Sequence, residues 1–359
     1  MSRRYEEGIP ALYKYQGVKY FHFDVPPGVS YVLSADPWSF LQAWLAQRIP
    51  ESRSKNRNCL NRALYYARLA GDFYWTADSV DMPIKATLTY YGMLNLVKCY
   101  LSVKGVELER TWEHHGLSLI LEKKQTMQIK RSTRKTVSIF AEFARLLDKP
   151  VSEQKRLSAS EVIRHIPEVH EMAYTLEVLP WAKRKFLPIQ IDFLVNATKR
   201  KIFTEVRYEK KNDARVDTTK FYVGRRKEYF DKKGETDGWI IFRSKKRKNV
   251  SQQNFRRIYQ NIKKEYECFD FCSILRRDGY KYYCDLKPGN YHHLCFSLAL
   301  LFYIGSVARY RPTEVEELEK SRLGPIVNEA LAVVPTQFLY QLVSLITSNV
   351  VVVPQSKLG

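Results

Sequence analysis

Apolar positions follow a helical period over much of the first half of the chain. The clearest case is residues 88–97, where no charged residue occurs and apolar side chains recur three and four positions apart. This pattern predicts a helix that is buried on most of its sides, followed by a turn at Gly105. We expect the loop after that turn to carry Arg110, His114 and His115 to the start of another helix.

Further amphipathic stretches predict helices on both sides of this one. Asp36 is a suitable N-cap for the first of them, and Pro37 is favoured at the first helical position because no backbone donor is needed there. The expected helices in this part of the chain cover residues 36–50, 60–78, 137–147 and 158–175. Two apolar helical stretches follow at 292–315 and 325–353. The apolar run in the first, residues 294–308, is shorter than the roughly 20 residues of a membrane span, and polar residues interrupt the second, so we expect both in the core.

Beyond Pro188 the pattern changes from helical to alternating. Residues 189–195, 201–209 and 238–244 alternate apolar and polar side chains and are rich in β-branched and aromatic residues, as strands are. Residues 250–266 return to a helical pattern. Residues 269–286 predict a hairpin with Asp278 and Gly279 at its turn, a pair that is typical of tight hairpin loops.

Together these patterns predict a mainly α fold with a basic α+β insertion. We expect a helical bundle that is completed by the C-terminal helices. The expected domains are an N-terminal arm over residues 1–35, the bundle over 36–186, the insertion over 187–287 and the C-terminal helices over 288–359.

The charge of the chain is strongly positive and unevenly distributed. Its 59 Lys and Arg residues against 38 Asp and Glu residues give a net charge of +21. Residues 199–264 alone hold 22 basic and 8 acidic residues, a net charge of +14. Concentrated positive charge favours a polyanionic partner, so we expect this region to bind nucleic acid, RNA before DNA. The basic residues expected to contact it are Lys199, Arg200, Lys201, Arg207, Lys210, Lys211, Arg225, Arg226, Lys227, Lys245, Lys246, Arg247, Lys248, Arg256 and Arg257.

Aromatic residues are interleaved with these basic ones. Basic side chains can follow a phosphate backbone while aromatic rings stack on the bases. The alternative is a solvated charged sheet whose aromatic side chains form the core. The residues concerned are Tyr208, Phe221, Tyr222, Tyr229, Phe230 and Tyr259.

The six cysteines are interpreted as thiols in a reducing compartment. Cys268, Cys272 and Cys284, with His292 and His293 nearby, lack the closely spaced pair of a zinc knuckle, so no metal site is expected. No Gly-rich phosphate loop or nucleophile elbow occurs, and we expect no cofactor. The first residues contain no apolar signal-peptide core, which favours a cytoplasmic protein without membrane association.

Three stretches together resemble the YaaC-like family of bacterial proteins. Residues 90–117 contain YYGMLNLVKCYL and HHGL. Residues 292–312, HHLCFSLALLFYIGSVARYRP, form an apolar helix that runs into an Arg-Tyr-x-Pro exit. Residues 60–74, LNRALYYARLAGDFY, fit the same family. The resemblance covers both ends of the chain and implies a shared fold, but no particular activity.

Residues 90–121 are also similar to the paired core helices of HEPN domains. Those domains are small helical bundles that often dimerise, act on RNA and belong to phage-defence, toxin–antitoxin or CRISPR systems. Active members carry an Arg followed within a few residues by a His, a spacing that Arg110 and His115 satisfy. The resemblance therefore implies a homodimer, a protein partner in a defence or stress system, and a metal-independent endoribonuclease with Arg110, His114 and His115 as catalytic residues.

This chemistry has a physical basis, but the sequence leaves alternatives open. A histidine with a pKa of about 6.5 can move a proton from a ribose 2′-hydroxyl to the leaving group, while an arginine stabilises the charge on the phosphate. Without catalysis, His115 and Gly116 would form a turn at a helix start and Arg110 would pair with Glu113 or Glu107. The third interpretation is a non-enzymatic scaffold or assembly subunit whose basic face meets an acidic protein.

A different enzyme pattern lies in the expected insertion. Asp192 on one strand, Glu205 on the next and Arg207 two residues along resemble the carboxylates and the cation of a metal-dependent nuclease. Charges paired across a solvated sheet face explain the same residues without any chemistry.

Overall fold

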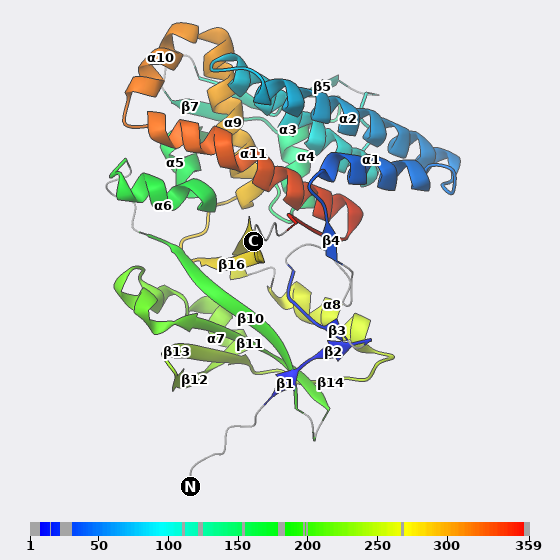
Figure 1. Cartoon of the computed structure of the whole chain (residues 1–359), viewed down its shortest axis with the longest axis vertical. Helices are drawn as coiled ribbons and strands as arrows, with labels where there is room; N and C mark the ends of the chain where they lie inside the picture. Colours follow the sequence, from blue (N-terminus) through cyan, green and yellow to red (C-terminus); the bar gives the residue numbers. More distant parts are fainter. Residues whose placement is uncertain are drawn as a thin grey trace, which may run out of the picture. The chain divides into compact units, whose positions relative to one another are not determined.

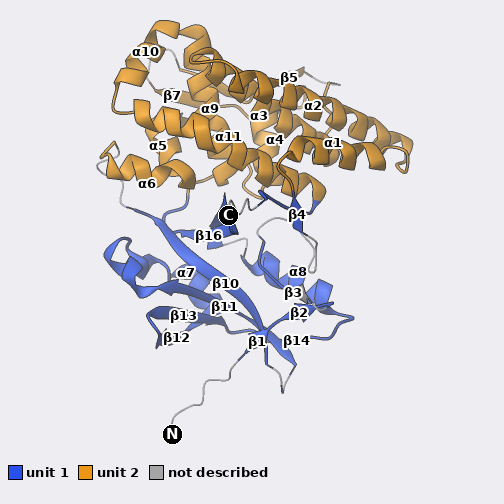
Figure 2. Cartoon of the chain, viewed as in Figure 1, with its two compact units in different colours: residues 1–33, 183–288, 348–359 blue, residues 34–182, 289–347 orange. Residues whose placement is uncertain are grey.

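The computed structural model describes residues 8–14, 16–21, 31–109, 112–120, 125–152, 155–178, 184–196, 198, 200–266 and 269–354. The chain divides into two compact units, each built from segments that are distant in the sequence (Figure 2). Unit 1 comprises residues 1–33, 183–288 and 348–359, and unit 2 comprises residues 34–182 and 289–347.

Unit 2 is built mainly from helices (Figure 1). The central helix α3 packs against α2, α9 and α11, and the shorter helices α4 and α5 contact α9. The helices are α1 (Pro37–Arg48), α2 (Ser54–Asp78), α3 (Ile84–Val103), α4 (Ile139–Leu146), α5 (Ala159–Arg164), α6 (Pro167–Thr175), α9 (His293–Tyr310), α10 (Pro312–Lys320) and α11 (Gly324–Thr347).

Local sequence explains several helix boundaries. The Asp36 carboxylate accepts hydrogen bonds from the amides of Trp38 and Ser39, each over 3.1 Å, and the predicted N-cap of α1 is confirmed. Hydrogen bonding, led by the Ser39 side chain, lowers the pKa of Asp36 below its usual 3.8. The helix expected over residues 158–175 is wrong as one element, because Pro167 interrupts it and the preceding Ile166 is extended.

The buried helix expected before Gly105 is confirmed as α3. Thirteen of its residues are buried, and Gly105 follows it with a φ of 80°. A Cβ added at Gly92 would lie 2.5 Å from Cδ2 of Tyr74, so only glycine allows α2 and α3 to approach this closely.

Unit 2 also contains short strands between α3 and α5. β5 (Trp112–His114) pairs in parallel with β8 (Thr136–Ser138). β6 (Leu117–Leu119), β7 (Thr126–Ile129) and β9 (Arg156–Ser158) form a small antiparallel sheet. His115 and Gly116 therefore connect two strands, and the expected helix start at this position is wrong. Strands of three or four residues are too short to show a period in the sequence.

Unit 1 contains, within its described residues, an eight-stranded antiparallel sheet. Six strands follow the order β12-β13-β11-β10-β16-β15, with β1 beside β10 and β14 beside β11 (Figure 1). The strands are β1 (Ile9–Pro10), β10 (Phe186–Asn196), β11 (Lys201–Glu209), β12 (Phe230–Thr236), β13 (Trp239–Ser244), β14 (Lys248–Asn249), β15 (Phe271–Arg276) and β16 (Gly279–Asp285).

The remaining elements of unit 1 are helices and two small strand pairs. The helical elements are α7 (Gly224–Tyr229), α8 (Phe255–Tyr266) and the 3₁₀ helices η1 (Lys210–Ala214) and η2 (Thr218–Lys220). β2 (Leu12–Tyr13) pairs with β3 (Gln16–Gly17), and β17 (Val350–Val352) pairs in parallel with β4 (Tyr31–Leu33).

Alternation in the sequence explains the large sheet. In β10, Ile191 and Phe193 enter the core while Asp192 points to the other face, as a period of two requires. The expected strands at 189–195, 201–209 and 238–244 are confirmed as β10, β11 and β13. The predicted hairpin is also confirmed, but its loop is residues 277 and 278, and Gly279 begins β16 with a φ of 102°.

The expected fold class, mainly α with a HEPN-like helical bundle, is wrong. An eight-stranded sheet and the short strands of unit 2 make this an α+β protein within the part of the chain that the structure describes. Two causes are identifiable. β12 interrupts its register between Lys232 and Gly234, which hides its alternation, and β1, β4 and β17 are too short to be recognised from sequence.

Two helices of the described chain are long and apolar enough to cross a membrane by length and composition. They are α9 and α11, and 89% and 72% of their most apolar windows are buried within the structure. A buried core helix meets the same criterion, so the two helices give only weak evidence for a membrane span.

Candidate functional site

Basic residues gather at the end of the large sheet where β11 begins. We call this surface the basic edge and define it as Arg200, Lys201, Lys245, Lys246, Arg247 and Lys248. Backbone pairing builds it, because Ile202 of β11 is opposite Lys248 of β14, and the Val250 amide donates to the Arg200 carbonyl over 2.9 Å. Two chain segments separated by more than forty residues therefore present their basic side chains together.

The side chains of the basic edge are largely accessible. Arg200, Lys245, Lys246 and Arg247 are exposed. Lys245 lies 3.9 Å from the Asp231 carboxylate, a weak exposed ion pair. The Lys246 ammonium and the Arg247 guanidinium lie 5.9 and 5.3 Å from the ring centres of Tyr229 and Phe203, respectively. Such a surface can contact phosphate groups in water without a large desolvation penalty.

The ends of two helices lie next to the basic edge. The Lys245 amide donates to the Tyr229 carbonyl at the end of α7 over 2.9 Å, and Arg225 and Lys227 of this helix are exposed. The Asn254 side chain donates to the Asn249 carbonyl over 3.3 Å, which joins the start of α8 to β14. Arg256 and Arg257, both exposed, follow in the first turn of α8.

Other expected contact residues do not belong to this surface. Lys210 and Lys211 follow the opposite end of β11, about 26 Å from its start at the rise of a strand. Arg226 is buried and donates to the carbonyls of Lys220 and Phe221, so its role is structural. Lys199 lies outside the described residues.

The aromatic residues expected to stack on bases lie in the core of unit 1. Tyr208, Phe221, Phe230 and Tyr259 belong to the buried cluster that packs between the sheet and α8. Tyr222 and Tyr229 are partly buried, and both pack against the same cluster. The interpretation in which the aromatics form the core therefore fits the structure better than base stacking does.

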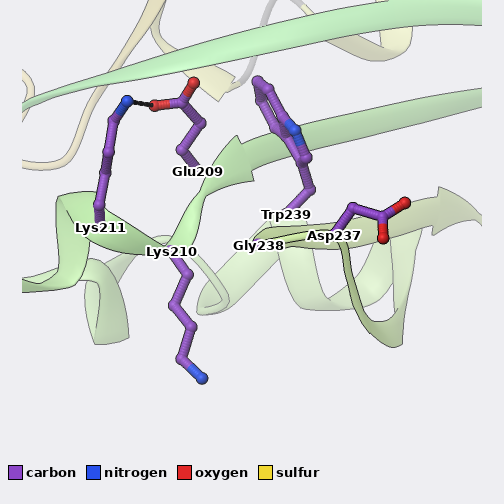
Figure 3. A pocket seen from close by; sticks show the side chains of 6 residues that line it. All are labelled: Glu209, Lys210, Lys211, Asp237, Gly238 and Trp239. Atoms are coloured by element: carbon purple, nitrogen blue, oxygen red, sulfur yellow. Dashed lines mark ion pairs between the residues drawn. The ribbon is translucent and has the colours of Figure 1, made fainter.

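A shallow pocket of about 450 Å³ lies at the far end of β11 and β13 (Figure 3). In the close-up, Glu209 and Lys211 form an ion pair and point to the same side as Trp239, whereas Lys210 points away. Lys210 instead bonds Glu235 over 2.7 Å. The residues that line the pocket are Glu209, Lys210, Lys211, Asp237, Gly238 and Trp239. Acidic and basic groups balance here, so the pocket lacks the excess charge of the basic edge.

Both carboxylates of the nuclease-like pattern form ion pairs with arginines. Asp192 and Glu205 are directly opposite on β10 and β11. Arg207 lies 3.3 Å from Asp192, and Arg243 donates to Glu205 over 2.8 Å in a nearly buried pair. Burial raises the pKa of Asp192, although Arg207 opposes this shift. The arrangement fits charge pairing across a sheet face better than an open metal site.

Metal-ligating side chains do not cluster in the described parts of the two units. No group of three or more His, Cys, Asp or Glu residues there could hold a metal ion. Cys272 and Cys284 are buried on β15 and β16, and burial raises the pKa of Cys284 to about 12. Cys268 lies outside the described residues.

His115, one of the histidines singled out in the sequence, lies among two tyrosines and an arginine in unit 2. The ring of His115 lies 5.6 and 5.9 Å from the rings of Tyr90 and Tyr91 on α3. Arg309, near the end of α9, donates to the Tyr91 hydroxyl. We call Tyr90, Tyr91, His115 and Arg309 the His115–Arg309 cluster.

The environment of His115 disfavours its charged form. Burial and the positive charges of Arg309 and Lys98 lower the pKa of His115 from 6.5 to about 4, so the ring is neutral at pH 7. Burial also lowers the pKa of His114, whose Nδ1 accepts from the Gly116 amide over 3.1 Å. Gly116 has a φ of 84°, and an added Cβ would lie 2.3 Å from Ser138 Oγ. This close packing fixes the position of His115.

The arginine beside His115 differs from the one expected. Arg110 lies outside the described residues, whereas the positive charge of Arg309, which contacts Tyr91, contributes to the lowered pKa of His115. Sequence spacing could not identify Arg309, because it follows His115 by almost two hundred residues. The family resemblance could have indicated this pair, because both residues lie in the stretches that carry it. Arg309 belongs to the Arg-Tyr-x-Pro exit of residues 292–312, and His115 belongs to the HHGL of residues 90–117. The structure brings these two stretches together because α3 packs against α9.

One of three comparisons with known proteins covers both of these stretches. A search of the curated proteins and a search of the solved structures each returned no match. No comparison supports the HEPN resemblance. The sequence model described as YaaC-like Protein matches residues 31–346, which covers most of the chain and parts of both units. The chain therefore belongs to the YaaC-like protein family.

Proposed function

We propose that this protein binds nucleic acid, RNA before DNA, through the basic edge of unit 1. The observation that carries the proposal is the convergence of two basic segments, residues 200–201 and 245–248, at one end of the sheet. Lys and Arg side chains on one surface neutralise successive phosphates and release the counterions that surround them. The exposed arginines at the start of α8 extend the same charged surface.

The burial of the aromatic side chains limits how the basic edge can recognise its ligand. Base stacking would need exposed rings, and the core of unit 1 holds these instead. We therefore expect binding that depends on the phosphate backbone and discriminates weakly between sequences. Asn249, Gln252 and Gln253 are exposed beside the edge and can hydrogen-bond a ribose 2′-hydroxyl, which supports RNA before DNA.

The test compares two triple variants with the same change in charge. In the first, Lys245→Gln, Lys246→Gln and Arg247→Gln alter the basic edge. In the matched control, Arg276→Gln, Arg277→Gln and Lys287→Gln alter exposed residues of unit 1 at the β15–β16 hairpin and just beyond it. Fluorescence anisotropy with a labelled single-stranded RNA, and with DNA of the same sequence, measures affinity over a series of salt concentrations.

We expect the edge variant to lose at least about tenfold in RNA affinity at low salt. Its plot of log K against log salt should become flatter by about 2, because each lost phosphate contact removes about 0.7 from the slope for a single strand. The control variant should stay close to the wild type. Equal losses in both variants would show that only total charge matters, and no binding to either nucleic acid at low salt would end the proposal.

The remaining expectations need separate experiments. Size-exclusion chromatography with light scattering tests the homodimer, and RNA incubation in EDTA with and without His115→Ala tests the endoribonuclease. Co-purification with an acidic protein, free of nucleic acid, would instead support the scaffold interpretation. None of these outcomes depends on the basic-edge variants.

A further inference from the structure

We propose that the His115–Arg309 cluster of unit 2 binds a phosphate group. This inference does not depend on nucleic-acid binding by unit 1, because it concerns other residues and a different, partly buried environment. Two kinds of observation carry it, buried polar atoms without partners and the local charge, and the chemistry of the donors selects the ligand.

Buried polar atoms in the cluster, and one on the adjoining turn of α9, lack hydrogen-bond partners among the described residues. They are the Tyr90 hydroxyl, Nε of Arg309, and the hydroxyl of Ser306 one turn earlier on α9. Tyr90 is only 1% exposed, and the charge of Arg309 acts on its hydroxyl. A buried donor without a partner is unfavourable, so a ligand that accepts hydrogen bonds here would stabilise the unit.

The charge around these atoms is positive. Burial is the largest cause of the lowered pKa of His115 and disfavours any charge, but the positive charges of Arg309 and Lys98 lower this pKa further, and the same two charges attract an anion. Glu113 forms an ion pair with Lys98 over 3.3 Å, which leaves Arg309 as the main positive charge of the cluster. Arg309 is part-buried, where its charge is less screened than on the surface.

The donors select a phosphate group over other ligands. The Arg309 guanidinium offers a planar fork that matches two oxygens of a phosphate. The hydroxyls of Tyr90 and Ser306 can donate to further oxygens of a tetrahedral group, and a planar carboxylate has fewer acceptors for them. A metal cation is disfavoured because the positive charges would repel it.

The cluster lies next to an exposed residue. Tyr310, next to Arg309 in sequence, is 66% exposed, and its ring centre lies 4.3 Å from the Arg309 guanidinium. The Tyr90 hydroxyl is buried, so a ligand that reaches it must be small, and a terminal or free phosphate meets this condition better than the middle of a polymer. Inorganic phosphate and a nucleoside monophosphate are therefore the two probes.

The experiment uses the full chain and isothermal titration calorimetry with inorganic phosphate and with adenosine 5′-monophosphate. The measurements are made at ~0.3 M KCl, where binding to exposed charges is largely screened. The variants are Arg309→Gln and Tyr90→Phe, and Arg68→Gln, an exposed arginine of α2, is the control. Thermal unfolding with and without each probe provides a second measurement.

We expect wild type and Arg68→Gln to bind inorganic phosphate, and Arg309→Gln to lose at least about tenfold in affinity. Tighter binding of adenosine 5′-monophosphate would identify a monoester as the ligand, and equal or weaker binding would identify free phosphate. Tyr90→Phe keeps the packed ring, so it should remain as stable as the wild type without phosphate but gain less stability with phosphate.

If Arg309→Gln fails to fold, the Tyr90→Phe variant still tests the proposal. Loss of stability in Tyr90→Phe without phosphate would show that the hydroxyl has a structural partner, and would overturn the inference. Absence of binding by the wild type, or equal binding by wild type and Tyr90→Phe, would overturn it as well.

Discussion

At the basic edge of unit 1 most of the charged side chains are exposed and the aromatic core beneath them is buried, whereas the His115–Arg309 cluster of unit 2 holds an arginine, two tyrosines and a histidine together in a partly buried place. The basic edge carries exposed lysines and arginines over a core of Phe and Tyr. In unit 2, Arg309 contacts Tyr91 and acts on a buried tyrosine hydroxyl and a histidine. The same residue types therefore serve two different purposes.

The difference shows that the environment of a charge matters more than the number of charges. Exposed charges act over about 10 Å and weaken as salt is added, so the basic edge suits a long, flexible polyanion. A partly buried charge acts locally and resists salt, so the cluster suits a compact anion. The high net charge in the sequence draws attention to the first surface and gives no indication of the second.

The largest expected effect is the loss of stability when an aromatic side chain is removed from the core of unit 1. If stability did not fall, the contrast between the two units would be wrong. Phe221 is 2% exposed, and its ring centre lies 4.9 Å from that of Phe242. Phe221→Ala should lower the free energy of unfolding by about 3–5 kcal/mol because it leaves a cavity in the core. Urea denaturation measures this, with Tyr65→Ala at an exposed position of unit 2 as the control.

A milder substitution separates packing from recognition at the same position. Phe221→Leu should cost about 1 kcal/mol in stability and leave RNA affinity unchanged, because the ring contacts core residues and not the ligand. If RNA affinity fell while stability stayed constant, the aromatics of unit 1 would be recognition residues, and the contrast between the units would disappear.

A medium effect tests how tightly unit 2 holds its histidine. Gly116→Ala should destabilise the protein by about 2–3 kcal/mol, since it combines a positive φ with a Cβ 2.3 Å from Ser138 Oγ. Gly105→Ala is the control, because its φ of 80° is similar but nothing lies within 4 Å of the added carbon. It should cost about 1 kcal/mol. Equal thermal shifts in the two variants would contradict the close packing.

The smallest effect concerns pH and sharpens the electrostatic difference. The pKa of His115 is about 4 in the folded protein and 6.5 as its ordinary value, so the unfolded chain binds more protons between these values. Stability therefore falls as the pH drops from about 6.5 to about 4. We expect this loss to be about 1–2 kcal/mol larger in the wild type than in His115→Asn, after allowance for solvent screening.

Urea denaturation at several pH values measures this difference. His114→Asn is the control, since His114 is less deeply buried and we expect a smaller change. Parallel pH profiles for the wild type and His115→Asn would mean that the ring is better solvated than its contacts indicate.

Local patterns in the sequence identify much of the fold. The N-cap at Asp36, the buried α3, the strands β10, β11 and β13 and the β15–β16 hairpin all follow from residues that are close together in the chain. The share of strand could not be predicted, because β12 is irregular and several strands have only two or three residues. These short strands pair with strands that are distant in the sequence, so no local pattern predicts them.

In the candidate sites, too, local sequence identifies some residues and only the folded structure identifies the others. Residues 245–248 are visible as a run of basic residues, but only the pairing of β14 with β11 shows that Arg200 and Lys201 join them. His115 was a candidate from the sequence, whereas Arg309 enters its surroundings through helix packing. The buried position of Arg226 was hidden because its exposed neighbours on α7 have the same charge.

The pairing of β17 with β4 has a consequence for how the protein is made. Val350–Val352 are buried against Tyr31–Leu33, and roughly 320 residues separate the two strands. At ~5–20 residues per second, a ribosome needs roughly 15–60 s to add the partner of a strand that it made near the start. The open edge of β4 is thus exposed to solvent or chaperones throughout that interval. Unit 1 can be completed only after Val350–Val352 have been synthesised, so a premature stop shortly before Val350 would leave it unfinished.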